Sequence, residues 1–392
     1  MKLTKDISSL DIKISNVEGI VLSSPYGDNK VFGQPKGLKS IGIIMITLEN
    51  GIVGYGETYS GIYSPELIKP LANFYLDKIK GLKLRDLIYN LDTFFDIPFI
   101  GFNGLLQSIK SAFSVALIDC LSRYLEVPIY ELFNKKLKPI KTYVSGGSVT
   151  YNENEVLKDA ETLRSKGFEI YKMRMGLQDL KSDLLRIKNA YQVFGNNENL
   201  IVDLIQGTLK SNYSNEDYLQ IFSCLNEYNL GWVEEPTEPW RIQHLPYIKS
   251  ISNNKIGTGE AYSGLMSFYQ LIDNNMIDIV QYDLTHSGSI DSCFEISRLA
   301  VDKGIEQVLH VWGSSLSLHS NAIFSLINNN IKLLEYPSVN FALSDDIRQV
   351  KHKIKNGFLI FDNDFLGTGI EINKEIRNKY PFVKGSGYSI NK

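Results

Sequence analysis

Residues 200–236 read LIVDLIQGTLKSNYSNEDYLQIFSCLNEYNLGWVEEP, and this stretch decides the predicted fold. An apolar run at 200–202 ends in Asp203, and a second apolar run at 231–233 ends in Glu234, with a helical pattern between them. A buried strand, a helix and a second buried strand make up the repeating unit of parallel α/β folds. The stretch therefore predicts one such repeat, with a carboxylate at the end of each strand.

The same pattern continues on both sides of this stretch. Amphipathic segments separate most of the further strands, and the clearest predicted helix, at 289–303, ends at Gly304, a residue suited to a helix C-cap. The other β-rich runs lie at residues 142–144, 169–173, 256–257, 277–281, 307–308 and 332–334. Eight strands that alternate with helices predict a parallel barrel of the α/β class.

A different pattern precedes the barrel. The β-rich runs lie at residues 12–22, 41–48 and 52–57, and the hairpin signal Asn50-Gly51 joins the last two. Helical periodicity begins at about Pro65 and continues, with breaks, to about Phe133. After Pro337 the regular alternation stops. We therefore predict an α+β unit at residues 1–135, a barrel at 136–340, and a tail at 341–392 that packs back on the first unit.

Composition limits the possible partners. The chain has 392 residues, more than one hydrophobic core usually holds, which also favours two structural parts. Its formal net charge is −3 at pH 7, so nothing indicates nucleic acid or an anionic membrane as a partner. The three cysteines are widely spaced and form neither a metal-binding spacing nor a disulfide framework. We predict no signal peptide and no transmembrane span, and we expect a cytoplasmic protein.

Ionisable side chains follow seven successive predicted strands. In chain order they are Lys172 with Arg174, Asp203, Glu234, Glu260, Asp283, His310 and Glu335. One such acid alone is usually a helix cap or a solvated turn residue. Caps have no reason to recur at every repeat, whereas the C-terminal strand ends of a barrel converge on one face, where active sites lie. The pattern therefore predicts one polar site on that face.

Three of these groups, Asp203, Glu234 and Glu260, come from adjacent strands and would repel one another without a cation. Hard oxygen ligands that leave positions for water and substrate favour Mg²⁺. In the alternative, one carboxylate is an outward-facing cap, and Lys172 and Arg174 neutralise the others. We favour the magnesium site, because in the alternative two side chains alone would have to neutralise the negative charge of the remaining carboxylates.

His310 and Asp283 follow neighbouring strands. An aspartate that accepts from one imidazole nitrogen leaves the other nitrogen free to take a proton. Removal of a proton next to a carboxylate becomes feasible when that carboxylate binds Mg²⁺ near Lys172. Glu335 could donate a hydrogen bond to the same carboxylate if its own pKa were raised. We therefore predict proton abstraction with His310 as the base.

Together these residues resemble the enolase superfamily, and within it the mandelate racemase subgroup. The matching positions are Lys172-Met-Arg174-Met-Gly176, Asp203, Trp232-Val-Glu-Glu-Pro236, Gly259-Glu260, Asp283 with Gly288, His310 and Glu335, together with residues 112–133 before the barrel. The resemblance implies a (β/α)7β modified TIM barrel and an α+β capping domain formed by both ends of the chain. It also implies one Mg²⁺, with Glu234 rather than Glu235 as the ligand from the fourth strand.

The resemblance further implies that capping loops, here residues 23–37 and 58–65, close over the substrate, and that the chain forms a homo-oligomer. The segment 26–34 of the first loop would determine specificity. Tyr26, Trp312 and His286 are candidate substrate-binding residues. For Trp312 a packing role, and for His286 a place in a solvated loop, are equally open interpretations.

Three positions depart from the family pattern. Arg174 stands where many members have a second lysine that acts as a base, and a guanidinium, which stays protonated at neutral pH, is better suited as an anchor. Ile205 stands where an asparagine is frequent, and Gly288-Ser289 replaces a pair of glycines. The first departure bears directly on the reaction, because it leaves open whether Arg174 takes part in proton transfer.

A racemase needs a competent base on each face of the α-carbon, and Arg174 handicaps that reaction. A dehydratase can use His310 for both proton transfers if elimination is syn. The leading prediction is dehydration of a sugar acid (an aldonate or aldarate) to a 2-keto-3-deoxy acid, with a small carboxylate as the substrate. The alternatives are racemisation or epimerisation of a 2-hydroxy acid or amino-acid derivative and, from another class, a non-catalytic barrel that binds a carboxylate.

Overall fold

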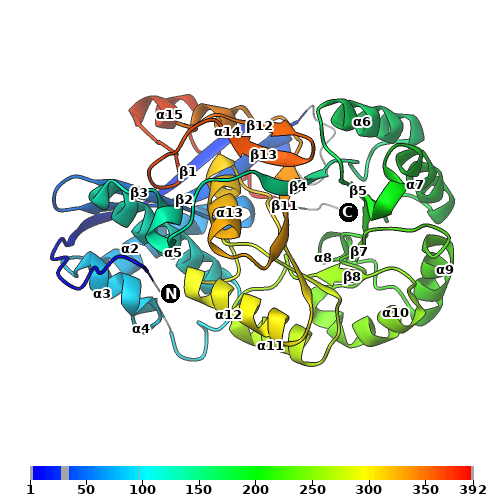
Figure 1. Ribbon diagram of the computed structural model, residues 1–392, viewed down its shortest axis with the longest axis horizontal. Helices are drawn as coiled ribbons and strands as arrows, with labels where there is room; N and C mark the ends of the chain where they lie inside the picture. Colours follow the sequence, from blue (N-terminus) through cyan, green and yellow to red (C-terminus); the bar gives the residue numbers. More distant parts are fainter. Residues whose placement is uncertain (1–2, 28–34, 96, 390–392) are drawn as a thin grey trace.

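Figure 1 shows the computed structural model, which describes residues 3–27, 35–95 and 97–389. In the described part of the chain the barrel strands are β4 (Ile140–Ser145), β5 (Tyr171–Arg174), β6 (Leu200–Asp203), β7 (Val233–Glu234), β8 (Ile256–Thr258), β9 (Ile279–Tyr282), β10 (Glu306–Leu309) and β11 (Ile331–Pro337). Each pairs in parallel with the next, and β11 pairs in parallel with β4, so the barrel is closed. All residues of β6 and β9 are buried, as expected for strands covered by helices on one side and by the barrel core on the other.

Helices connect consecutive strands and lie on the outside of the barrel (Figure 1). They are α6 (Glu153–Ser165), α7 (Leu180–Phe194), α9 (Asn215–Leu225), α10 (Leu245–Ile251), α11 (Leu265–Asp273), α12 (Ile290–Asp302) and α13 (Ser315–Ile327). The helix expected at 289–303 is α12, whose N-terminus is capped by Ser289 and which Gly304 follows with φ 69°. This order of elements confirms the predicted (β/α)7β barrel.

An antiparallel sheet precedes the barrel and consists of β1 (Ile14–Pro25), β2 (Leu38–Leu48) and β3 (Val53–Thr58). The hairpin signal lies between β2 and β3, where Gly51 has φ 85°, a value that glycine adopts at little cost. Helices α2 (Ile68–Ile79), α3 (Leu84–Tyr89), α4 (Leu91–Phe95) and α5 (Leu105–Leu125) follow the sheet, with α2 against β1 and α5 against β3.

Helix α5 packs very closely on the sheet. A Cβ atom at Gly56 would lie 1.9 Å from the backbone oxygen of Ala112, so this contact requires glycine. On its other side, Ser111 donates to the backbone oxygen of Gly288 in the barrel at 2.7 Å. By length and hydropathy α5 would suit a membrane span, but 89% of its apolar window is buried inside the fold. Its apolar surface is therefore core.

The C-terminal segment contacts both parts. Strands β12 (His352–Lys355) and β13 (Phe358–Phe361) form a hairpin, and β13 pairs antiparallel with β4 of the barrel. Beyond the hairpin, Ile370, Ile372 and Ile376 pack in one apolar cluster with Ile20 and Ile43 of the first sheet. Ile376 belongs to α15 (Lys374–Lys379), and the other short α-helices in the described part of the chain are α1 (Ser60–Tyr63), α8 (Gln206–Leu209) and α14 (Ala342–Asp346). The tail thus completes the capping unit, as predicted, and adds a hairpin to the barrel.

Candidate active site

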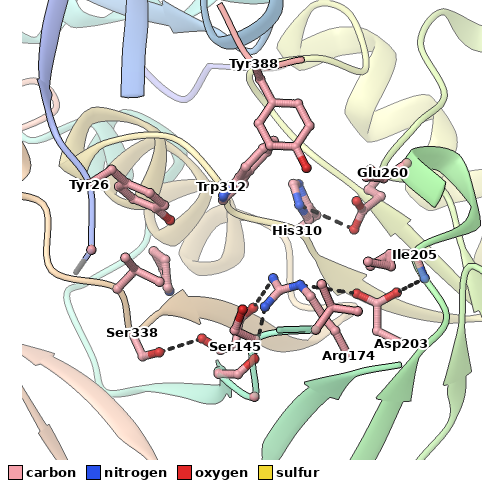
Figure 2. A pocket seen from close by; sticks show the side chains of 18 of the residues that line it. Tyr26, Ser145, Arg174, Asp203, Ile205, Glu260, His310, Trp312, Ser338 and Tyr388 are labelled. Carbon is pink, nitrogen blue, oxygen red and sulfur yellow. Dashed lines mark hydrogen bonds and ion pairs between the residues drawn. The ribbon is translucent and has the colours of Figure 1, made fainter. Parts of the chain in front are cut away.

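A cavity of about 350 Å³ lies at the C-terminal ends of the barrel strands (Figure 2). The barrel lines it with Arg174, Asp203, Glu260 and His310, among others. Capping segments contribute Tyr26, Tyr59 and Tyr63, and the tail contributes Tyr388. In Figure 2 His310 and Glu260 lie above Arg174, and the Tyr388 hydroxyl is directed from the opposite end toward His310 and Glu260. Lys172, Glu234, Asp283 and Glu335 are buried around this cavity.

His310 is held by Asp283. Its Nδ1 lies 3.0 Å from Oδ2 of Asp283, while Oδ1 accepts from the backbone N and Oγ1 of Thr285 at 2.8 Å and from Nδ2 of Asn321 at 2.9 Å. With Nδ1 as the donor to Asp283, Nε2 faces Glu260 at 3.4 Å. Burial disfavours the imidazolium, but Glu260, Glu335 and Asp283 together raise the pKa of His310 to about 9.

Lys172 is the buried cation of the site. Its Nζ lies 2.5 Å from Oε1 of Glu234, 2.9 Å from Oε1 of Glu335 and 3.7 Å from Oδ2 of Asp203. Burial opposes the ammonium charge, but these carboxylates raise the pKa of Lys172 well above its usual value. Trp232 donates from Nε1 to the other oxygen of Glu234 at 2.9 Å. Glu234 is therefore held on both oxygens.

The three expected metal ligands lie close enough to influence one another. Burial and the charge of Glu234 raise the pKa of Asp203 to about 8, and burial also raises the pKa of Glu260. Their side chains do not converge on one point: among the described residues, no group of three His, Cys, Asp or Glu side chains could hold an ion as arranged. Glu234 is turned toward Lys172, and Glu260 toward His310. As buried oxygen donors on adjacent strands they suit Mg²⁺ in kind.

Glu335 lies against Lys172. It accepts hydrogen bonds from Nζ of Lys172 at 2.9 Å, from the hydroxyl of Tyr143 at 3.2 Å and from the backbone N of Val311 at 3.1 Å. Although burial opposes ionisation, Lys172 and then His310 lower the pKa of Glu335 to about 2. The condition under which Glu335 would donate, a raised pKa, is therefore not met in this arrangement, because a buried ammonium lies against this carboxylate. Glu335 is an acceptor that positions Lys172.

Arg174 is anchored by the end of β4. Its Nη2 donates to Oγ of Ser145 at 2.7 Å, its Nη1 donates to the backbone oxygen of Gly146 at 3.0 Å, and its Nε lies 3.8 Å from Oδ2 of Asp203. Burial opposes its charge, but Asp203 and Glu335 raise the pKa of Arg174 above its already high value. The side chain thus presents a fixed cation to the cavity. Ile205 also lines the cavity, and its N–H donates to Oδ1 of Asp203 at 2.7 Å.

Of the candidate substrate-binding residues, Tyr26 and Trp312 both line this cavity. Trp312 also packs, with its ring centroid 4.9 Å from that of Tyr388. Lys39 lies behind them: its Nζ donates to the backbone oxygen of Trp312 and is 4.3 Å from the ring centroid of Tyr26. Burial lowers the pKa of Lys39 to about 7.

His286 lines a different cavity, of about 980 Å³, which also borders Tyr59 and Glu260. Its ring centroid is 5.0 Å from that of Tyr59, and burial lowers the pKa of His286 to about 4. Within the predicted capping loops, Tyr59 and Tyr63 border both cavities. The part of the first loop at residues 28–34 lies outside the described residues.

Sequence reasoning did not find Tyr59, Tyr63, Tyr388 or Lys39. A single lysine inside the apolar run 38–48 was an available signal for Lys39, because a strand buried on both faces rarely carries an unpaired charge. Tyr388 stands in an irregular tail without periodicity, and the sequence around it offers no comparable signal.

Comparison with known proteins assigns the family. The model of the family described as Enolase C-terminal domain-like matches residues 155–376, more than half of the chain. Curated relatives include dehydratases of sugar acids as well as racemases and epimerases. The L-talarate/galactarate dehydratase of Salmonella typhimurium is 26% identical over 311 residues, which cover 78% of this chain and 76% of that protein.

Solved structures agree in fold. A member of the enolase superfamily from Polaromonas sp. JS666 has a TM-score of 0.84 and 23% identity, covering 96% of this chain and 100% of that chain. An enolase from Bradyrhizobium complexed with magnesium and mandelic acid has a TM-score of 0.78 and 22% identity, covering 94% and 98%. At such identities the structural likeness establishes the fold alone. With the family match, it follows that this chain belongs to the Enolase C-terminal domain-like family and has the fold of the enolase superfamily.

Proposed function

We propose that the protein is a Mg²⁺-dependent enzyme that removes the α-proton of a small carboxylate and dehydrates a sugar acid to a 2-keto-3-deoxy acid. The observation that carries the proposal is the asymmetry of the cavity. One side holds the titratable imidazole of His310, oriented by Asp283 at 3.0 Å. The other side holds Arg174, a cation that does not release its proton at neutral pH.

Asp203, Glu234 and Glu260 would hold the Mg²⁺ ion. When bound, the ion would supply positive charge against the second negative charge that develops on the substrate carboxylate as the α-proton leaves. Lys172 and Arg174 add fixed positive charge beside the same place, since both ammonium and guanidinium remain protonated in this surrounding.

His310 moves the protons. With Nδ1–H donated to Asp283, Nε2 accepts the α-proton from the face of the substrate that it adjoins. The same Nε2–H can then be donated to the β-hydroxyl on that face, so that water leaves and the imidazole returns to its starting form. One residue thus serves both transfers of a syn elimination, and no second base is needed.

Racemisation or epimerisation is the second candidate, because curated relatives include enzymes with those names. It needs a proton donor and acceptor on the Arg174 side. The guanidinium there is fixed by hydrogen bonds to Ser145 and Gly146. Asp203 and Glu335 raise the pKa of Arg174, so that it does not release its proton. This side of the cavity therefore favours dehydration over racemisation.

The test is incubation of the protein with Mg²⁺ and pooled aldonates and aldarates in D₂O, followed by mass spectrometry, with His310→Asn as the matched control. We expect a keto acid that is smaller by one water and absent from the control. Deuterated substrate without loss of water would instead support a racemase or epimerase. Unlabelled, unchanged acids across the pool would count against proton abstraction from this substrate class.

A further inference from the structure

Lys39 is a buried cation to which the proposed reaction gives no role. It lies in β2 of the capping unit and is 0% exposed. Three aromatic rings lie near its Nζ, with centroids at 4.3 Å for Tyr26, 4.7 Å for Trp312 and 5.6 Å for Phe341. A desolvated ammonium at such distances is attracted to the faces of the rings. The cation therefore holds together side chains that come from three separate parts of the chain.

Two of these side chains, Tyr26 and Trp312, line the cavity of about 350 Å³ and form what we call its aromatic wall (Figure 2). Lys39 also donates from Nζ to the backbone oxygen of Trp312, so it holds the backbone of this residue as well as its ring. Trp312 follows His310 by two residues, in the segment that joins β10 to α13. The arrangement of the wall beside the proton acceptor thus depends on Lys39.

The capping unit holds the same segment at a second point. Glu57 of β3 is 1% exposed, and it accepts from the backbone N of Ser314 at 3.0 Å and from Oγ of Ser314 at 2.5 Å. A Cβ atom at Gly313 would lie 2.4 Å from Oε1 of Glu57, so the two parts of the fold are in close contact here. Glu57 fixes the segment after Trp312, and Lys39 is the contact that fixes Trp312 itself.

The charge of Lys39 changes in the neutral range of pH. Burial lowers the pKa of Lys39 to about 7, although Glu57 on β3 raises it; Arg174 on β5 lowers it further and Glu335 on β11 raises it. Tyr26 stays neutral in this range, because burial raises its pKa to about 12. Below pH 7 the ammonium is attracted to the rings, and above pH 7 the neutral amine loses this attraction. A contact made by Lys39 should therefore weaken as the pH rises through 7.

We propose that Lys39 is a positioning residue that holds Tyr26, Trp312 and the segment after His310 in the arrangement that forms the aromatic wall. It acts on a bound acid through Tyr26 and Trp312. This effect on an acid rests on the proposed function, because it requires a substrate in the cavity. The arrangement of the wall does not, and this allows the two to be tested separately.

The first test follows Trp312 by ¹⁹F NMR in the full chain labelled with 5-fluorotryptophan, in EDTA so that no metal adds to the titration. Trp312→Phe assigns the resonance among the three tryptophans of the chain. At pH 6 we expect the Trp312 resonance of Lys39→Met to differ from that of the wild type. The difference should shrink as the pH rises through about 7, because the wild type then loses the same charge.

Two further variants make this result specific. Lys110→Met is the matched control, since Lys110 is also a lysine of the capping unit, is 4% exposed and lies 2.6 Å from Asp92; it should leave the Trp312 resonance unchanged. Lys39→Arg keeps its charge at every pH, so its difference from Lys39→Met should stay constant up to pH 8. The titrations of other cavity groups are common to all variants and cancel in these differences.

Three results would overturn the proposal. The first is the absence of a difference between wild type and Lys39→Met at pH 6. The second is a difference that stays constant up to pH 8, because a merely structural effect of the substitution would not follow the charge of Lys39. The third is an equal change in Lys110→Met.

The second test measures α-proton exchange of pooled aldonates and aldarates in D₂O with Mg²⁺ at pH 6. Lys39→Met should exchange about tenfold more slowly than the wild type at low acid concentration and approach it at saturation, because the wall acts on binding. Equal rates at both concentrations, or an equal fall at both, would contradict this action of the wall. If the ¹⁹F result is as expected but no acid exchanges in either protein, the proposed function fails while the positioning role of Lys39 stands.

Discussion

Nδ1 of His310 lies 3.0 Å from Oδ2 of Asp283, and the other oxygen of that carboxylate is occupied by Thr285 and Asn321. The carboxylate therefore cannot rotate without breaking bonds to both neighbours. This arrangement fixes the imidazole plane and directs Nε2 away from Asp283. The proton acceptor of the site thus owes its direction to residues that do not line the cavity.

Asp283→Asn should lower α-proton exchange by about 10²–10⁴-fold, the usual range for loss of effective general-base catalysis. An amide keeps the shape of the side chain but removes the charge that stabilises the imidazolium, and its NH₂ group can select the wrong ring tautomer. Exchange is measured in D₂O by NMR, with circular dichroism as the control for folding. Wild-type exchange in a folded Asp283→Asn protein would refute the role of the dyad.

Lys172→Met should destabilise the metal-free protein by about 3–5 kcal/mol, because it leaves Glu234 and Glu335 buried without their cation. Urea denaturation in EDTA measures the difference. Lys249→Met is the matched control, since its partner Asp278 is at 2.8 Å but both side chains are about 30% exposed, and it should cost at most about 1 kcal/mol. Added Mg²⁺ should restore part of the loss if the carboxylates bind it. Equal losses of unfolding free energy in the two variants would contradict the role of Lys172 as the cation that neutralises the buried carboxylates.

The pKa of His310, about 9 in the fold against 6.5 ordinarily, has a consequence for stability. Because the folded pKa is the higher one, the stabilisation is fully present below pH 6.5 and is lost as the pH rises through 9. In EDTA, the difference in unfolding free energy between wild type and His310→Asn should therefore shrink over this window, by up to about 3 kcal/mol. A difference that stays constant from pH 6 to pH 10 would show that Glu260 and Glu335 do not hold the proton.

The strand-end groups could be predicted from the sequence because each belongs to a local repeat. Asp203 and Glu234 follow short apolar runs, and those runs became adjacent strands with Asp203 opposite Glu234. Closure of the barrel could be predicted because eight strands of this kind alternate with helices along the chain. The same reasoning cannot fix side-chain rotamers, which is why the turn of Glu234 toward Lys172 was not foreseen.

The part of the cavity lining that the C-terminal tail contributes could not be predicted in this way. Tyr388 lies there because its backbone N donates to the oxygen of Ile62 at 2.7 Å, a contact between residues far apart in the sequence. The direction in which the pKa of Glu335 is shifted could not be predicted for a related reason: it depends on the distance to Lys172, which two strands far apart in the sequence determine. Contacts of this kind leave no periodic trace in the sequence.

Arg174→Lys tests which face of the substrate can exchange protons. A lysine there would lose the bonds to Ser145 and Gly146 but would provide an amine whose pKa can be lowered by burial, unlike that of a guanidinium. We expect dehydration to fall by about 10–100-fold, the cost of two lost hydrogen bonds, and the α-proton of the epimeric acid to begin to exchange in D₂O. Arg174→Met, which supplies neither cation nor base, should lose dehydration without gaining that exchange. If the wild type already exchanges both epimers at equal rates, Arg174 itself takes part in proton transfer and the one-base assignment is wrong.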